Sequence, residues 1–256
     1  MPFGPMLAVD ISVGTHLTTK VAGLTFNLDT IWGTGVALVV VLVLGFLVAR
    51  KPANRVPSKM QLVWEMGVDA VTRQVEGSIG PRGQSVIPLA LALFVFILVA
   101  NALEIFGIGS KVEALGPPTA DVNLPAAMAI FVIVLVHIAS VRSRGLKGYV
   151  RHYLMQPFSP LLMPVNLFIN FVEEISKPFT LALRLFGNLF SGTLMLALIA
   201  ALAAWKLGPV PVGDVGTFIF AVIWKLFDVL LIGPIQAFIF ALLTILYFTS
   251  AMATDH

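Results

Sequence analysis

The sequence predicts an all-α, multi-pass membrane protein with about five membrane-embedded helices and one amphipathic helix at the membrane surface. Three observations support this fold class. Hydrophobic residues make up 58% of the 256 residues and charged residues only 11%, whereas ordinary soluble domains carry about 25% charged residues. Several apolar runs are long enough to cross a bilayer as a helix. The basic residues gather beside these runs, which is typical of topology signals and not of a nucleic-acid-binding surface.

The first half of the chain contains the shorter apolar runs. Residues 1–29 are mixed in composition, lack a cleavable signal pattern and are expected to form an external segment. Residues 30–50, 86–106 and 124–141 are predicted to form the first three spans. Residues 60–80 place charged side chains among Leu, Val and Trp, which predicts an amphipathic helix at the membrane interface.

The last two apolar segments, residues 161–204 and 217–250, are much longer. Each exceeds the ~20 residues that a helix needs to cross a bilayer. We therefore expect both helices to tilt strongly, to kink or to lie partly in the membrane plane. Pro178 and the Gly233–Pro234 pair are natural places for a bend. A break rich in Gly and Pro, at residues 208–211, separates the two segments.

The positions of Lys and Arg predict how the chain is oriented. Residues 50–82 contain six Lys or Arg and residues 142–151 contain four. The segments on the other side contain only Lys20, Lys111 and Lys206. The positive-inside rule then places the N-terminus outside and the C-terminus in the cytoplasm. No repeat divides the chain, so residues 1–256 are expected to form a single membrane domain.

Several classes of function are excluded. The chain has no cysteine, which rules out disulfides, thiolate chemistry and Cys-ligated zinc. It contains neither a phosphate-binding loop nor a dinucleotide fingerprint, so nothing in it suggests nucleotide binding. We therefore expect no catalytic residue, no cofactor, no metal site and no nucleic-acid partner.

A polar stripe runs through the first of the long segments. Its seven residues are spaced three or four apart and therefore share one helical face; they are Asn170, Glu173, Lys177, Thr180, Arg184, Asn188 and Ser191. Most residues between them are apolar. An arginine that faced lipid here would cost about 2.5–3.5 kcal/mol on insertion scales, and arginine does not lose its proton in proteins. Arg184 is thus predicted to be a fixed positive charge that faces water or a partner.

Two simpler interpretations of Arg184 exist. It could snorkel from a helix end, or it could pair with Glu173 or Glu174 on its own helix. Glu173 lies eleven residues away, about 16 Å along a helix, which is too far for direct pairing. The neighbours of Arg184 off the stripe are apolar for more than a turn on each side. These observations favour a functional arginine.

Three strings resemble subunit a of F-type ATP synthases, in its bacterial form, with the actinobacterial type as one option. They are Lys177-Pro178-x-x-Leu181-x-Leu183-Arg184-Leu185-Phe186-Gly187-Asn188 followed by Gly192, Gln236-Ala237-Phe238-Ile239-Phe240 with Leu243-Thr244-Ile245-x-Tyr247, and Pro118-Thr119-Ala120-Asp121-Val122-Asn123. The matches extend from about residue 118 to the C-terminus. They are specific as a set, although no single string would be.

The resemblance implies a non-catalytic stator subunit in the plasma membrane, with two offset proton half-channels. Its partners would be the c-subunit ring, the peripheral-stalk b subunits and the rest of the ATP synthase, in addition to membrane lipids. The last two helices would wrap against the c-ring. Arg184 would attract each c-ring carboxylate and favour its ionised form. The charge would also block a direct proton leak between the half-channels, so that proton flow turns the ring.

The resemblance also assigns polar neighbours to Arg184. Thr180 and Asn188, each one helical turn away, match positions that line its polar surroundings. Gln236 matches a glutamine of the family and would contact both water and the arginine helix. These three residues are predicted to belong to the proton path.

The exit path is less regular than in the family. Relatives commonly have a carboxylate fourteen residues before the arginine, where this chain has Asn170. We assign the exit path to the cluster of Asn170, Glu173 and Glu174. An i,i+4 pair between Glu173 and Lys177 is the structural alternative, and it is compatible with function.

The uptake path also departs from the family pattern. Many bacterial relatives have Glu nine residues after the arginine, and many have His seven residues before the glutamine. Thr193 and Val229 occupy these positions here. Asp228 is the only carboxylate of the segment 217–250, and we assign it to the uptake path. The alternative is a salt bridge between Asp228 and Lys225.

The remaining polar residues leave two interpretations open. Asp121 and Asn123 are expected either at the outer mouth of the uptake path or in an Asx turn or helix cap. Glu104 is equally compatible with an interface and with the proton path. His137 lies in the third span near its cytoplasmic end. We expect it to be packed and not functional, because a lone histidine at such a position is more often packed than catalytic.

A self-contained ion channel or secondary transporter is the alternative function. Such proteins usually show internal repeats or paired broken helices, and the sequence shows neither. Copurification with a c-ring would distinguish the two classes.

Overall fold

The computed structural model describes residues 18–21, 23–50, 59–103, 105, 118–156, 158, 160–204 and 212–252. Within these ranges the chain forms seven α-helices: α1 (Leu28–Ala49), α2 (Lys59–Ile79), α3 (Ile87–Ala102), α4 (Asn123–Met155), α5 (Met163–Ala204), α6 (Val212–Phe227) and α7 (Gly233–Met252). The shorter elements are β1 (Thr18–Val21), β2 (Leu24–Asn27), the 3₁₀ turns η1 (Pro81–Val86), η4 (Pro118–Ala120) and η5 (Pro160–Leu162), and the π-helical segment η6 (Asp228–Ile232). The strands form an antiparallel hairpin that the apolar pattern did not reveal.

Five helical stretches of the described chain are long and apolar enough to cross a membrane. They are Leu28–Ala49, Gly83–Ala102, Asn123–Met155, Met163–Ile199 and Gly216–Met252. The last two have 37 residues each, well above the ~20 that a bilayer requires. The predicted all-α, multi-pass class with two long C-terminal segments is therefore confirmed.

Helix α4 continues well past residue 141, where the apolar run ends. The basic residues 142–151 consequently lie on the helix and not in a loop. No proline interrupts the chain between Pro125 and Pro157, so nothing forces the helix to stop. Gly145 has a positive φ of 71°, which glycine adopts without a side-chain clash, and α4 is kinked at this point.

The two expected bends behave differently. Helix α5 stays helical through Pro178. Between α6 and α7, the chain instead widens into the π-helical segment η6, directly before Gly233. Pro234 has no N–H to donate to the carbonyl four residues earlier. The regular α-helical ladder cannot pass through this point, and a π turn is one way for the helix to adjust.

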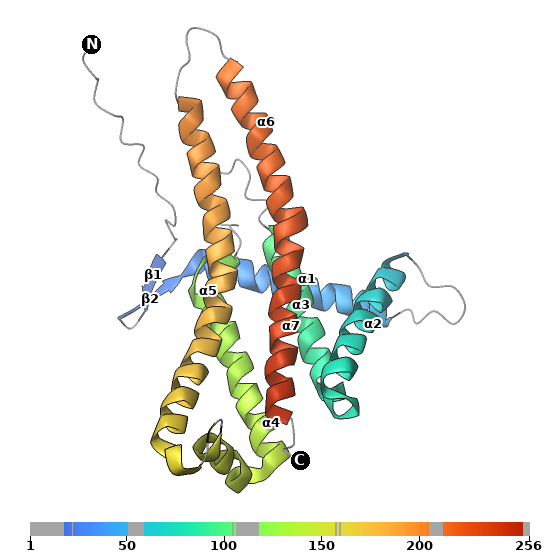
Figure 1. The fold of residues 1–256 in the computed structure, drawn as a ribbon. Coiled ribbons are helices and arrows are strands. Elements are labelled where there is room, and N and C mark those ends of the chain that lie inside the picture. Colours follow the sequence, from blue (N-terminus) through green and yellow to red (C-terminus); the bar gives the residue numbers. More distant parts are fainter. Residues whose placement is uncertain are drawn as a thin grey trace, which may run out of the picture.

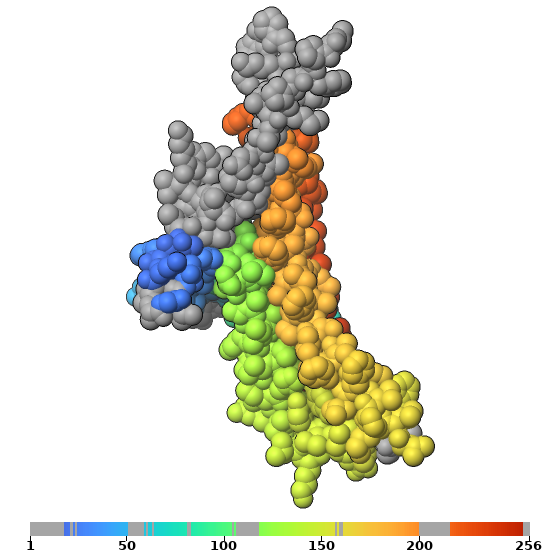
Figure 2. All heavy atoms as spheres, turned by 90° about the vertical axis from the view of Figure 1, so that its left-hand side faces the viewer, coloured from blue at the N-terminus to red at the C-terminus, as the bar shows by residue number. Residues whose placement is uncertain are grey.

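Helices α3, α4, α5 and α7 pack around one core, to which α2 adds Val75. The fully buried Ala90, Ala129 and Ala237 belong to this core, and such small residues let membrane helices approach closely. Figure 2 shows α4 and α5 side by side along the molecule. In Figure 1, α1 runs across the direction shared by α5, α6 and α7. These helices therefore cannot all follow one membrane normal.

Candidate functional site

Arg184 lies near the middle of α5, on its exposed side. The buried face of this helix is formed by Leu181, Leu185 and Leu189, which are 1%, 2% and 4% exposed. Thr180, one helical turn before Arg184, is exposed as well. In the parts of the chain that the structure describes, no side chain forms a hydrogen bond or ion pair with the Arg184 guanidinium. The charge is thus presented to whatever packs on this surface.

The hydroxyl groups near Arg184 point back to their own helix. Thr180 Oγ1 donates to the Ser176 carbonyl at 2.8 Å, and Thr193 Oγ1 donates to the Phe190 carbonyl at 2.8 Å. These bonds use the hydroxyl protons within α5, as is usual for Ser and Thr in helices. The hydroxyl oxygens can still accept hydrogen bonds from water. Asn188 is partly buried. The hydroxyls can therefore line a hydrated path, but they carry no titratable charge.

Asp228 is buried against α5. It is 2% exposed and begins the π-helical segment η6. Its carboxylate faces Gly192: a Cβ atom added to Gly192 would lie only 2.5 Å from Asp228 Oδ2. The absence of a side chain at Gly192 is thus what lets the Asp228 carboxylate reach α5, one residue away from Thr193. Sequence reasoning missed this role of Gly192, although Gly192 follows the arginine string.

Two buried polar residues hold the end of η6. Asn101 Nδ2, on α3, donates to the Gly233 carbonyl at 3.3 Å, and Thr119 Oγ1, on η4, donates to Asn101 Oδ1 at 2.8 Å. Asn101 and Thr119 are 2% and 0% exposed. Gln236, one turn further along α7, is 9% exposed. In the sequence, the sign that Asn101 has a structural role is that its polar amide lies at the end of an apolar run.

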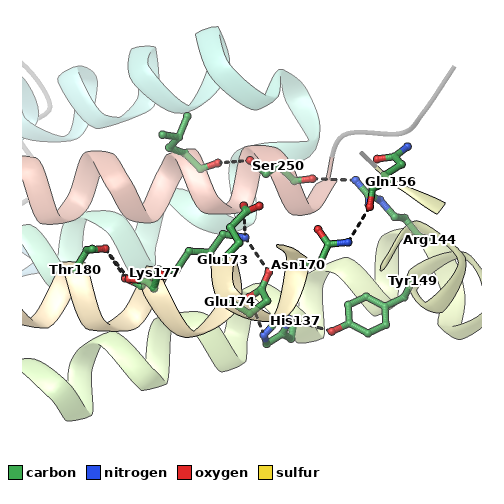
Figure 3. A network of polar contacts seen from close by, with 12 residues as sticks. His137, Arg144, Tyr149, Gln156, Asn170, Glu173, Glu174, Lys177, Thr180 and Ser250 are labelled. Carbon is green, nitrogen blue, oxygen red and sulfur yellow. Dashed lines mark hydrogen bonds and ion pairs between the residues drawn. The ribbon is translucent and has the colours of Figure 1, made fainter. Parts of the chain in front are cut away.

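A second polar cluster joins α5 to α4, ten residues before Arg184 (Figure 3). Lys177 Nζ lies 3.0 Å from Glu173 Oε1 and 2.8 Å from Glu174 Oε1. Glu174 Oε2 in turn lies 3.3 Å from His137 Nε2, on α4. The expected Glu173–Lys177 pair is present, and His137, which we expected to be merely packed, faces a carboxylate.

Asn170 has a local structural contact in the same region. Its Nδ2 donates to the carbonyls of Tyr153 and Gln156 at 2.8 and 2.9 Å. These carbonyls belong to the last residues of α4 and the turn after it, where helical partners run out. Asn170 therefore ties the end of α4 to α5. An amide also cannot ionise, so a titratable group must come from elsewhere, and Glu174 lies one turn further on the same face.

Asp121 anchors the N-terminal hairpin and α1 to the turn before α4. Its Oδ2 accepts hydrogen bonds from Asn27 Nδ2 (2.6 Å) and Thr30 Oγ1 (2.7 Å). Its Oδ1 accepts from the backbone N–H (3.0 Å) and Nδ2 (2.8 Å) of Asn123, which is the geometry of an Asx turn. Burial raises the pKa of the Asp121 carboxyl, but the bonds from Asn123, Asn27 and Thr30 outweigh it and hold the pKa below its ordinary value.

The predicted residues thus fall into separate groups along α5. Glu174 lies ten residues before Arg184, about 15 Å along the helix, and Gly192, which touches Asp228, lies eight residues after it, about 12 Å. Asp121 and Asn123 lie apart from both groups, beside α1. Glu104 lies outside the described residues. Two polar regions on opposite sides of one fixed charge could serve two separate proton paths.

Comparison with known proteins agrees with the resemblance seen in the sequence. The family described as ATP synthase A chain matches residues 30–249. The chain is 46% identical over 250 residues to ATP synthase subunit a of Acidothermus cellulolyticus, covering 97% of this chain and 86% of that protein. It is 41% identical over 258 residues to ATP synthase subunit a of Mycobacterium marinum, covering 98% and 97%. ATP synthase subunit a of Coxiella burnetii is 36% identical over 236 residues, covering 89% and 85%.

Proposed function

The chain belongs to the ATP synthase subunit a family, and we propose that its Arg184 separates two offset proton half-channels. The predicted family is confirmed. The protein is the membrane proton-translocating stator subunit of an ATP synthase and is not itself an enzyme. It is a multi-pass membrane protein, and as a bacterial subunit a it resides in the plasma membrane.

The observation that supports this use of Arg184 is its exposed position on α5 between two polar regions, one around Glu174 and one around Gly192 and Asp228. A c-ring carboxylate that arrives opposite the guanidinium is stabilised in its ionised form. It therefore releases its proton on one side of Arg184 and takes up a new proton on the other. Because arginine stays protonated, it neither relays protons nor loses its charge. Each elementary charge that crosses a potential of 100 mV supplies about 2.3 kcal/mol, so several protons must pass for each ATP.

The uptake path runs, in this proposal, from the outer side to Asp228. The π segment that begins at Asp228 ends at Ile232. The next residue, Gly233, is held through Asn101 to η4, the turn that leads to Asp121. Positive-inside orientation places this turn outside. Asp228 collects protons from a dilute external supply, and Thr193 and Gln236 line the rest of the path. Asn123 and Asp121 shape the outer mouth.

The exit path leads through Glu173 and Glu174 to the cytoplasm. Arg144, from the basic cluster on α4, lines the same cavity as both carboxylates, and basic clusters mark the cytoplasmic side. Thr180 lines the section of this path next to Arg184, whereas Asn188, one turn after Arg184, lines the uptake side. With the N-terminus outside and the C-terminus in the cytoplasm, the two paths open to opposite sides of the membrane.

The partners follow from the same proposal. The exposed surface around Arg184 faces the c-ring, with α5, η6 and α7 wrapped against it. The peripheral-stalk b subunits and lipid cover the remaining apolar surface. Exposed large apolar residues occur on α1 as well as on α5 and α7, for example Val39 (59%) and Phe238 (53%), so more than one partner surface is available.

Proton-driven ATP synthesis in membrane vesicles tests the role of Arg184. Arg184→Ala should abolish synthesis while the complex still assembles, because the variant removes the charge and not the buried face of α5. Arg151→Ala, which removes an exposed arginine on α4, is the matched control and should synthesise ATP normally. Normal synthesis by Arg184→Ala would refute the assignment.

A further inference from the structure

His137, on α4, faces the exit cluster directly. Its Nε2 lies 3.3 Å from Glu174 Oε2. Its other ring nitrogen, Nδ1, lies 3.1 Å from the Tyr149 hydroxyl. Both nitrogens of the ring are therefore engaged, one by a carboxylate on α5 and one by a hydroxyl on α4 (Figure 3). Such a ring can accept a proton at one nitrogen and release one to solvent.

The two carboxylates of the cluster differ in their surroundings. The side chain of Glu173 is 57% exposed, and Lys177 is its ion-pair partner. The side chain of Glu174 is only 22% exposed. Glu174 contacts Lys177 and His137 and also accepts a hydrogen bond from the Tyr153 hydroxyl. Glu174 thus connects α5 to His137 and Tyr153 of α4, which gives an exit path through Glu174 a way to continue along α4.

A small polar cavity of about 110 Å³ borders this pair. That is room for a few water molecules, since each takes about 30 Å³ in the liquid. The cavity opens between α4, α5 and α7. The titratable and charged groups that line it together with His137 are Arg144, Tyr149, His152, Tyr153, Glu173, Glu174, Lys177 and Tyr247. A proton that reaches His137 therefore has a hydrated polar route beside the basic end of α4.

We propose that His137 is a proton-relay residue that takes the proton from Glu174 and passes it to the cytoplasmic water. This inference rests on the proposed exit path. The proton that leaves the c-ring first joins the Glu174 carboxylate. It then moves from Glu174 Oε2 to His137 Nε2, which restores the carboxylate and gives an imidazolium. The imidazolium then releases its Nε2 proton to water in the cavity and returns to the neutral form with the proton on Nδ1, beside the Tyr149 hydroxyl, so charge and protons balance in each cycle.

The test is the passive proton conductance of complexes stripped of their soluble catalytic part, in inverted vesicles whose outer face is the cytoplasmic one. Histidine ordinarily exchanges protons between about pH 5 and 8. His137→Gln keeps a polar side chain but cannot titrate, so we expect about a tenfold or larger loss of conductance that varies across this pH range. Imidazole added outside the vesicles should restore conductance to His137→Ala. Arg151→Gln, an exposed change on α4 beyond the kink at Gly145, should conduct normally.

A structural role for His137 gives a different result. If the residue only packs α4 against α5, His137→Gln lowers conductance equally at all pH values and imidazole does not rescue His137→Ala. Either that outcome or wild-type conductance in assembled His137→Gln would overturn the inference. Glu174→Gln tests the exit path separately from the His137 relay. If Glu174→Gln blocks conductance and His137→Gln has no effect, the relay is rejected and the proposed exit path is retained. Normal conductance in Glu174→Gln together with Glu173→Gln would reject the exit path too.

Discussion

Replacing Gly192 by alanine should disturb proton uptake through a direct clash with Asp228. The added Cβ would lie 2.5 Å from Asp228 Oδ2 and 3.2 Å from its Cγ, where ordinary contact begins near 3.4 Å. The carboxylate must therefore move by about 0.9 Å, and Asp228 is only 2% exposed, so little free space exists. Overpacking of this kind costs about 1–3 kcal/mol. A cost of this size lowers the population of molecules with the carboxylate in its native position roughly 5- to 150-fold. The rate of uptake falls by the same factor if each uptake event requires that position.

ATP-driven proton pumping, measured by fluorescence quenching in inverted vesicles, is the assay for Gly192→Ala. Gly216→Ala is the matched control, because a Cβ at Gly216, on α6, meets nothing within 4 Å. Thermal stability of the purified complex gives a second readout: the loss in Gly192→Ala should largely disappear in an Asp228→Ala background, with a coupling of about 0.5–3 kcal/mol. Wild-type pumping by an assembled Gly192→Ala complex would show that the carboxylate position does not matter for uptake.

Three further outcomes can be checked in the same vesicles or in the purified complex. Asp228→Asn should slow ATP synthesis, most at high external pH where protons are scarce, while Asp228→Glu keeps part of the activity; equal rates across the pH range would leave uptake to water alone. Arg184→Lys should be nearly inactive, because lysine loses its proton more readily when buried and lacks the planar guanidinium; substantial synthesis would argue that any cation suffices. Asp121→Asn should lower stability by about 1–3 kcal/mol, since the Asn27 and Thr30 donors then face an amide. The pKa of Asp121 is lowered by folding, so its stabilisation is present above about pH 4 and is lost as the pH falls through the folded value; melting temperatures of Asp121→Asn should lack this acid-dependent loss.

The sequence was most informative where one physical rule decides the outcome. A long apolar run must be helical in a bilayer, because every backbone polar group needs a partner there. The number of long apolar helices and the unusual length of the last two followed from this rule. The family followed from short strings around Arg184 and Gln236. The basic residues on α4 were harder, because charge alone does not say whether a segment past a span is a loop or a helix.

The contacts between helices could not be predicted from periodicity. His137 and Glu174 are 37 residues apart, and Asn101 and Gly233 are 132 apart. Which faces meet depends on how small residues such as Ala129 and Ala237 let the helices approach. A lone histidine in an apolar run is compatible with packing and with function until its neighbour on the next helix is known.

Asp228 and Gln236 illustrate how a local irregularity alters such an argument. In a regular α-helix, eight residues would set their side chains about 80° apart. The π-helical segment η6 lies between them, and a turn closed by i→i+5 bonds winds less per residue than an α-helical one. The offset therefore shrinks, and both side chains are buried, at 2% and 9% exposure. The proline that disrupts the regular ladder thus helps to bring an acid and an amide toward the same face, where both can border the path beside Gly192.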